Sequence, residues 1–455
     1  VTVGAGGNLL ATGGLGEGND LLHVAGTLDT AGGTFVLGNG DDTLTIHDNT
    51  HLIGTVMAGA GNDTFNADIA TQADLGAVQD FETLSKTSGG VLNVNGPASS
   101  DFTTVNVLGG TLNVTAGGSI TAQTTTVATG AVLDVQGSYT GTDGDDSFTS
   151  RGTVRGAFAF GAGNDTVAFI GGNPSGVTSL NGGQGSDLLS FSGLELASGT
   201  LPTLTSWERV ELLNNSALNL VNQLDLSGGV LAIDGTSTLF ANAGAAIGGS
   251  VENAGLIDVG MNRLAISGNY TGSDGSLQLT VSPSALTAGG LNINGDVAGT
   301  TRVAFAGDGS DFTQGGTASI LVIASPNDNA ATAGGFVAAQ DVIRLEGSIY
   351  PWSFGQQADN NWYLNAEAGV LPEVPAYGVL PSLGLLAAQN SDNLIHQRLA
   401  GVRGSESPQC GVTPEWPVQR AGTEVIDDCR GVWVAATGSE TELGANPGFE
   451  VSGDD

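Results

Sequence analysis

Short runs in which apolar and polar residues alternate recur along the first two thirds of the chain, and glycine-rich turns separate them. Gly-Gly-Val-Leu-Asn-Val at 89–94 returns as Gly-Gly-Thr-Leu-Asn-Val at 109–114, and Ala-Val-Leu-Asp-Val follows at 131–135. Alternation of this kind predicts β-strands with one buried face. We expect the equivalent leucines, 20 and 21 residues apart, to stack in one internal column: Leu92, Leu112 and Leu133.

A second motif places glycines and an aspartate in front of a short apolar run. It reads GEGNDLL (16–22), GNGDDTL (38–44), GAGNDTF (59–65), TDGDDSF (142–148), GAGNDTV (161–167) and GQGSDLL (183–189). Its aspartates are Asp20, Asp42, Asp63, Asp146, Asp165 and Asp187. Steps within the two clusters are 22, 21, 19 and 22 residues, and the leucine repeat fills the 83-residue gap between them. One period therefore runs through both motifs.

A period near 21 favours a solenoid of short strands, because helical repeats of 33 or more residues need long amphipathic segments. One coil cannot bury its own apolar face, whereas a stack of coils makes a continuous core. Coils stacked at the strand spacing of ~4.8 Å would number about fourteen and form a rod of roughly 65–70 Å. We therefore predict an all-β chain with a right-handed parallel β-helix over residues 1–300.

The pattern changes after residue 300. Residues 301–366 carry longer β-rich runs and several aromatics, and we interpret them as a β-rich cap, because an open solenoid end exposes unpaired strand groups. Residues 367–404 form a predicted linker, in which prolines precede an α-helix from Pro381 to about Ala400. Residues 405–455 contain an alternating run, GVWVAAT, that predicts a further strand.

The order of these segments resembles the autotransporters of type V secretion, in their AIDA/pertactin-like branch. The resemblance rests on WYL at 362–364, PEVPAYGVLPSL at 372–383, VWV at 432–434 and GFEV at 448–451. It implies that 301–366 is an autochaperone-like cap and that 405–455 begins an outer-membrane β-barrel, truncated here. The chain opens within the repeat, without an initiator methionine or a targeting segment, so we expect it to be a fragment.

The resemblance also implies a passenger at the outer membrane or cell surface of a Gram-negative bacterium, either retained there or released. We expect a non-enzymatic adhesin or self-association and virulence factor. Its partners would be a host-cell surface or matrix, or other copies of itself, with the missing barrel in the outer membrane. Two alternatives stay open: a secreted enzyme passenger acting on polysaccharide, and a passive stalk that presents an N-terminal domain.

Charge and motifs narrow these classes. Eleven Lys and Arg oppose 46 Asp and Glu, and the net charge of −35 argues against nucleic acid and against docking on an anionic membrane. A polysaccharide-cleaving groove would need more basic residues than this. Neither a Gly-Asp-Ser-Gly loop nor a G-x-S-x-G elbow occurs, so we predict no catalytic residue.

The aspartate turns allow two interpretations. GGQGSDLLS at 182–190 matches the nonapeptide of calcium-binding β-rolls, and stacked aspartates would repel one another unless a cation lay between them. Calcium is therefore a candidate at Asp42, Asp63, Asp165 and Asp187. In the other interpretation, each aspartate hydrogen-bonds its own turn backbone, and glycine supplies positive φ. The matches are isolated rather than tandem, which favours the second, and we expect no other cofactor.

The two cysteines, Cys410 and Cys429, either pair or remain free thiols. They lie close together with no histidine partner nearby, which favours a disulfide over free thiols. His47 and His51 are four residues apart in a predicted strand and loop, so we do not expect them to share a metal.

Overall fold

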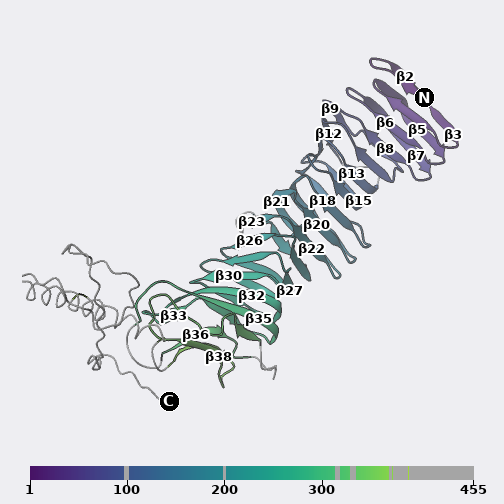
Figure 1. Cartoon of the computed structure of the whole chain (residues 1–455). Helices are drawn as coiled ribbons and strands as arrows, with labels where there is room; N and C mark the ends of the chain where they lie inside the picture. The colour runs from purple at the N-terminus through teal and green to yellow at the C-terminus, as the bar shows by residue number, and fades with distance from the viewer. Residues whose placement is uncertain are drawn as a thin grey trace, which may run out of the picture. The chain divides into compact units, whose positions relative to one another are not determined.

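The structure, a computed structural model, describes residues 1–96, 102–197, 201–312, 318–327 and 335–367, together with Leu371 and Ala388. The chain divides into two compact units, and the first comprises Val1–Ser348 and Trp352–Glu367. Its strands are wound into a β-solenoid of about 13 turns (Figure 1). Apart from Ala388, the predicted helix and the predicted barrel start lie outside the described residues, as do Cys410 and Cys429.

Three columns of parallel strands run along the solenoid. The first column contains β1 (Thr2–Val3), β4 (Leu21–Val24), β6 (Thr43–Ile46), β8 (Thr64–Ala67), β11 (Thr83–Lys86), β13 (Phe102–Val107), β15 (Ser119–Val127), β18 (Ser147–Ser150), β20 (Thr166–Ile170), β22 (Leu188–Ser192), β25 (Arg209–Leu213), β27 (Gln223–Ile233), β29 (Ala246–Asn253), β32 (Tyr270–Ser282) and β35 (Val297–Gly307).

The second column contains β2 (Asn8–Leu10), β5 (Thr27–Asn39), β7 (His51–Ala60), β9 (Gln72–Asp74), β12 (Val91–Val94), β14 (Thr111–Val114), β16 (Val132–Val135), β19 (Thr153–Ala159), β21 (Asn173–Asn181), β23 (Glu195–Ala197), β26 (Ala217–Leu220), β28 (Thr238–Ala241) and β30 (Leu256–Gly260). The third column adds β3 (Gly13–Glu17), β10 (Ala77–Gln79), β17 (Ser138–Thr140), β24 (Thr203–Thr205), β31 (Arg263–Ile266) and β34 (Gly290–Ile293). Long strands such as β5 and β7 bend, and their two halves serve different columns.

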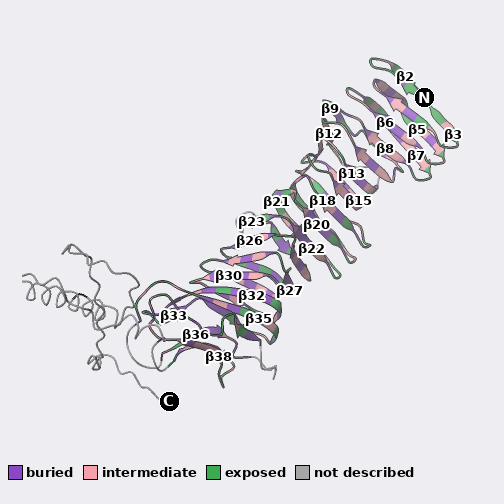
Figure 2. Cartoon of the chain, viewed as in Figure 1, coloured by how far each residue is buried: buried purple, intermediate pink, exposed green. Residues whose placement is uncertain are grey.

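The core consists of several columns of inward side chains stacked in register, and each column has one side chain per coil. Leu92 lies opposite Leu112, and Leu112 opposite Leu133, and all three are fully buried. Buried and accessible residues alternate along the strands, as Figure 2 shows. Burial of apolar surface at about 25 cal/mol per Å² stabilises such a stack. The predicted parallel solenoid and its leucine column are confirmed, while its right-handed sense stays a prediction.

The last coils are covered by strands of another kind. β36 (Ser319–Ala324) pairs with β34 in parallel and with β39 (Trp362–Ala366) antiparallel, and β38 (Trp352–Gln356) pairs with β39. β37 (Phe336–Ala338) pairs with β35 in parallel, and the short β33 (Thr287–Ala288) pairs with β32 antiparallel. Trp362 packs edge-on against Phe336 at a ring distance of 5.2 Å. Antiparallel strands thus cover the end where parallel stacking stops.

Arg263 of β31 joins this end to the last coils. Its guanidinium donates to the carbonyl oxygens of Leu321 and Val322 in β36 at 3.1 and 3.0 Å, and to that of Leu291 at 3.0 Å. Burial lowers the pKa of Arg263, but a guanidinium stays charged in proteins. Within the described part of the chain, no helix has the length and hydropathy needed to cross a membrane.

Candidate functional site

The motif aspartates lie together at the corner that precedes the first strand column, and we call them the acidic corner: Asp20, Asp42, Asp63, Asp146, Asp165 and Asp187. The backbone N–H of Asp42 donates to Asp63 Oδ1 at 2.6 Å, and that of Asp165 to Asp187 Oδ1 at 2.9 Å. Asp20 and Asp146 donate in the same way to the next aspartate along. The predicted adjacency of the paired aspartates is therefore confirmed.

The bonding pattern differs from the predicted one. We expected each aspartate to accept from its own turn, but Asp42, Asp63, Asp165 and Asp187 accept a backbone N–H of the preceding coil. Asp146 also accepts from its own turn, through the backbone N–H of Thr142 at 2.8 Å. Asp146 is the first aspartate of the second cluster, which continues with Asp165 and Asp187.

A glutamate ends each ladder. Glu82 Oε2 accepts the N–H of Asp63 at 2.6 Å, and Glu208 Oε2 accepts that of Asp187 at 2.8 Å. Each glutamate follows a buried aromatic residue, Phe81 or Trp207, at a corner without the glycine motif. The sequence carries this signal, an aromatic–Glu pair one period after the last motif aspartate, but neither glutamate is among the predicted site residues.

The residues just before the aspartates form a second ladder in the opposite direction. Asn19 Oδ1 accepts the N–H of Asp41 at 2.9 Å, and Asn164 Oδ1 accepts that of Ser186 at 3.0 Å. Consecutive N–H groups therefore bond to opposite neighbours, and each corner is held to the coil on both sides.

Glycine is required at this corner for two reasons. Gly183 has φ of 112°, and a Cβ there would lie 1.8 Å from the carbonyl oxygen of Gly161. Gly185, with φ of 142°, would meet Gly163 in the same way at 1.7 Å. Positive φ and close backbone approach both exclude a side chain.

The corner carboxylates are buried and only partly satisfied. Asp42, Asp63, Asp165 and Asp187 are at most 1% exposed, and their Oδ2 atoms have no hydrogen-bond partner within the described residues. Burial raises the pKa of Asp165 to about 6, against the opposing effect of the N–H that it accepts from Asp146. Burial likewise raises the pKa of Asp63 and of Asp187. Folding therefore makes the carboxyl groups of Asp63, Asp165 and Asp187 harder to ionise than a free aspartate.

Metal binding at this corner stays a prediction. Calcium takes six to eight oxygen ligands. Over the ranges that the structure describes, no three His, Cys, Asp or Glu residues gather as a ligand set. Each Oδ1 is engaged by backbone, so a cation would have to draw on the Oδ2 atoms and on backbone carbonyls.

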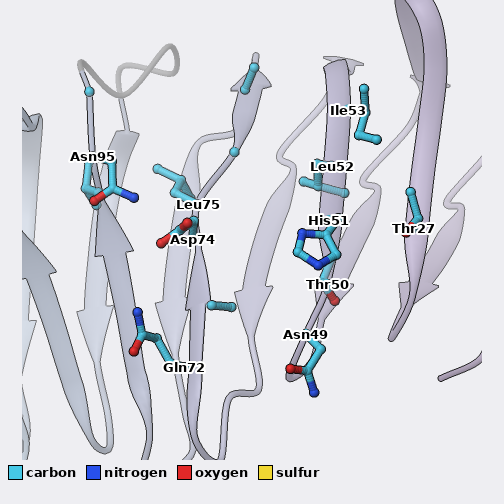
Figure 3. A pocket seen from close by; sticks show the side chains of 15 residues that line it. Thr27, Asn49, Thr50, His51, Leu52, Ile53, Gln72, Asp74, Leu75 and Asn95 are labelled. Carbon is cyan, nitrogen blue, oxygen red and sulfur yellow. The ribbon is translucent and has the colours of Figure 1, made fainter. Parts of the chain in front are cut away.

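A second candidate site is a groove of about 1000 Å³ where the second column is interrupted. The His51–Ile53 part of β7 pairs with β5, and β9 pairs with β12, but among the described residues these two strands have no partner on their facing edges. Figure 3 shows side chains of the two strands around this opening, among them Leu52 and Asp74. The remaining lining residues are Thr27, Asn49, Thr50, His51, Ile53, Gln72, Ala73, Leu75, Gly76, Ala77, Val94, Asn95 and Gly96.

The groove is closed at both ends. Asp48 Oδ1 accepts both the N–H and the hydroxyl of Thr71, at 2.7 and 2.9 Å, which ties the coils together before the strands separate. Beyond the groove, Ala77 pairs in register with Thr55. The opening is therefore one strand segment long, with intact pairing on either side.

A third feature is a polar surface on the first column. One outward position is threonine in five successive coils, in register: Thr43, Thr64, Thr83, Thr104 and Thr124. Beside it runs a second polar rank, which is half-buried except at Thr45, where the residue is only 5% exposed: Thr45, Asn66, Ser85, Asn106 and Thr126. We call these two rows the threonine ranks.

Comparisons with known protein families and with curated proteins find no match for this chain. The candidate sites therefore rest on geometry.

One buried residue was not predicted from the sequence: Lys86 occupies an inward position between Ala67 and Val107 and is fully buried. Its ammonium donates to the carbonyl oxygens of Ile69, Ser88 and Gly109, and burial lowers its pKa.

Proposed function

We propose that this chain is a surface-displayed autotransporter passenger that acts through contact, as a non-enzymatic adhesin or by self-association. The observation that carries the proposal is the pair of threonine ranks. Their side chains repeat at the strand spacing of ~4.8 Å and offer hydroxyl and amide groups as both donors and acceptors. Such a surface recognises another regular polar surface by many weak bonds.

The family assignment and the location within this proposal rest on the resemblance of residues 345–455. A β-solenoid is compatible with a passenger, and the same fold also serves enzymes. The groove beside β9 holds one histidine and one carboxylate, His51 and Asp74, among its lining residues. The contact function is therefore the better-supported proposal.

Self-association can be tested with polystyrene beads coated with the full chain. Lysines at Thr64 and Thr104 would place charge in the middle of the ranks without touching the core, because both positions face outward. We expect this double variant to reduce bead clustering at least tenfold. The matched control places lysines at Thr121 and Thr140, which bond to each other at 3.0 Å in the third column. Equal clustering of all three proteins would exclude the ranks.

Adhesion and display need separate tests. The same two variants can be compared for binding to immobilised host-cell matrix, where loss in the rank variant alone would support adhesion. Display is tested with the complete gene in a Gram-negative host, by protease treatment of intact cells. Protection of residues 1–367 from external protease would contradict surface display.

A further inference from the structure

Among the residues that the structure describes, main-chain groups of β7 and β9 that face the groove have no strand partner. In a parallel pair, alternate residues direct both their N–H and C=O to the same neighbour. His51 donates to Gly26 O in β5's coil, so Leu52, next to it, directs its own groups into the groove. On the other side, Leu75 donates to Asn93 O, and Val91 donates to Thr71 O. Gln72 and Asp74 therefore direct their groups into the groove as well.

These two edges match what an added strand requires. A parallel strand placed between them would bond Leu52 through the two residues flanking its central one. The central residue itself would donate to Gln72 O and accept from the N–H of Asp74. Both sets of bonds follow from one register, because Leu52 and Ala73 occupy successive positions of the same inward column. An exposed strand edge is a general template for such pairing.

The volume of the groove is sufficient for about three residues, and Gly76 approaches the side chain of Leu52 at one end of it. An extended tripeptide occupies ~10 Å along the strand, ~4.8 Å between strands and ~10 Å across the sheet, or roughly 500 Å³. The groove measures about 1000 Å³, which leaves room for side chains. The inward position is unusually open, because Ala73 stands where the next coil has Leu92. A central apolar residue of moderate size would fill it.

The residues at the rim of the groove indicate which side chains would flank the central residue of the added strand. Asp74 is exposed at the outer edge of β9, and Ile53 of β7 is 50% exposed across from it. The lining residues include one carboxylate and no lysine or arginine, and the whole chain carries a charge of −35. A lysine or arginine beside the central residue would cover Ile53 with its aliphatic stem and bring its charge to Asp74.

We propose that this groove binds an extended segment of a partner protein as an inserted β-strand, with a central apolar residue flanked by lysine or arginine. This inference deepens the contact function proposed above by naming one site and its partner chemistry. Adhesion through the threonine ranks does not use the groove, so the two proposals can fail separately.

The test measures fluorescence anisotropy of a labelled acetyl-Thr-Lys-Val-Lys-Thr amide titrated with the full chain. The same peptide methylated on the valine nitrogen keeps its charge and composition but loses the donor to Gln72 O. We expect saturable binding of the first peptide and at least about tenfold weaker binding of the second. Equal binding of both would reveal only attraction of a cation to an acidic protein, and would overturn the proposal.

Protein variants locate the site. Ala73→Leu fills the groove and should abolish binding, while bead clustering stays unchanged. Asp74→Asn should weaken binding about threefold. The matched control is Asp134→Asn, at the same register position on an uninterrupted ladder, and it should leave binding unchanged. Circular dichroism checks folding. Undiminished binding to Ala73→Leu would overturn the proposal, as would binding of cellohexaose but of neither peptide.

Discussion

Two corners of the solenoid make the same kind of hydrogen bond with different chemistry. At the acidic corner, the N–H of Asp165 donates to the carboxylate of Asp187. At another corner further along the chain, the N–H of Ser216 donates to the hydroxyl of Ser237 at 3.1 Å, and Leu194 donates to Ser216. Both corners satisfy a buried N–H with a side chain of the next coil. Stacking therefore requires an acceptor, and the negative charge of the acidic corner is an additional property.

The charge has an energetic consequence. A serine hydroxyl both accepts and donates a hydrogen bond, and Ser216 donates to the carbonyl oxygen of Phe191 at 2.9 Å. The serine side chain therefore has no second oxygen that is buried without a hydrogen-bond partner. A carboxylate has a second oxygen, and at the acidic corner this Oδ2 is buried without a partner in the described region. Burying an unpaired charge destabilises the folded state unless the group takes up a proton or a cation.

The largest difference between the corners should come from glycine. Gly183→Ala places a Cβ against Gly161 O at positive φ, and we expect it to destabilise its coil by about 3 kcal/mol or more. Gly235→Ala, beside the serine corner, has its nearest atom at 3.8 Å and should change stability by less than about 1 kcal/mol. Urea unfolding of both variants measures this, and similar midpoints would show that the corners are not packed differently.

The next effect is the pH dependence of the acidic corner. The pKa of Asp165 is about 6 in the folded state, above its ordinary value of 3.8. Its contribution to stability is therefore fully present below about pH 3.8 and is lost as pH rises through 6. The free energy of opening these coils should fall by on the order of 2–3 kcal/mol from pH 4 to pH 7.

Hydrogen exchange of the coils around Asp165, corrected for the intrinsic pH dependence, measures this effect. Coils around the serine corner serve as the internal control and should show no such change. Greater protection of the acidic corner at pH 7 than at pH 4 would contradict the prediction.

Removal of the acceptor should affect both corners alike. Asp187→Ala and Ser237→Ala each leave a buried N–H unpaired, which costs about 1–3 kcal/mol. Asp187→Asn keeps an acceptor and removes the charge, so it should be more stable than Asp187→Ala at every pH. Thermal melting at pH 7.5 compares the three, and equal melting of Asp187→Asn and Asp187→Ala would show that the hydrogen bond contributes little.

The smallest expected effect is that of calcium. Because each Oδ1 is engaged, we expect millimolar calcium to raise the melting temperature by no more than about 2 °C over chelator, with magnesium as the control. If calcium bound only the folded state, it would stabilise that state by ~2.7 kcal/mol at a calcium concentration one hundred times the dissociation constant. A calcium-specific shift of several degrees that disappears in Asp187→Ala would make calcium a structural cofactor of the acidic corner.

The sequence by itself determined the period, the strand type and the inward columns. Leu92, Leu112 and Leu133 could be placed in one column because side-chain alternation and a 20- or 21-residue step are local properties. The glycines of the acidic corner were recognisable for the same reason, since positive φ is a demand on a single residue. Adjacency of Asp42 with Asp63 followed directly from the step.

Only the tertiary structure decided which groups those residues bond. The donor to Asp187 Oδ1 is the backbone N–H of Asp165, a choice that depends on how far one coil lies from the next. The groove between β7 and β9 could not be predicted from the sequence either, because Leu52 and Ala73 lie at the expected register positions and yet do not pair. Pairing depends on the path of two whole coils, set by contacts as distant as that of Asp48 with Thr71. Such non-local contacts leave no periodic signal in the sequence.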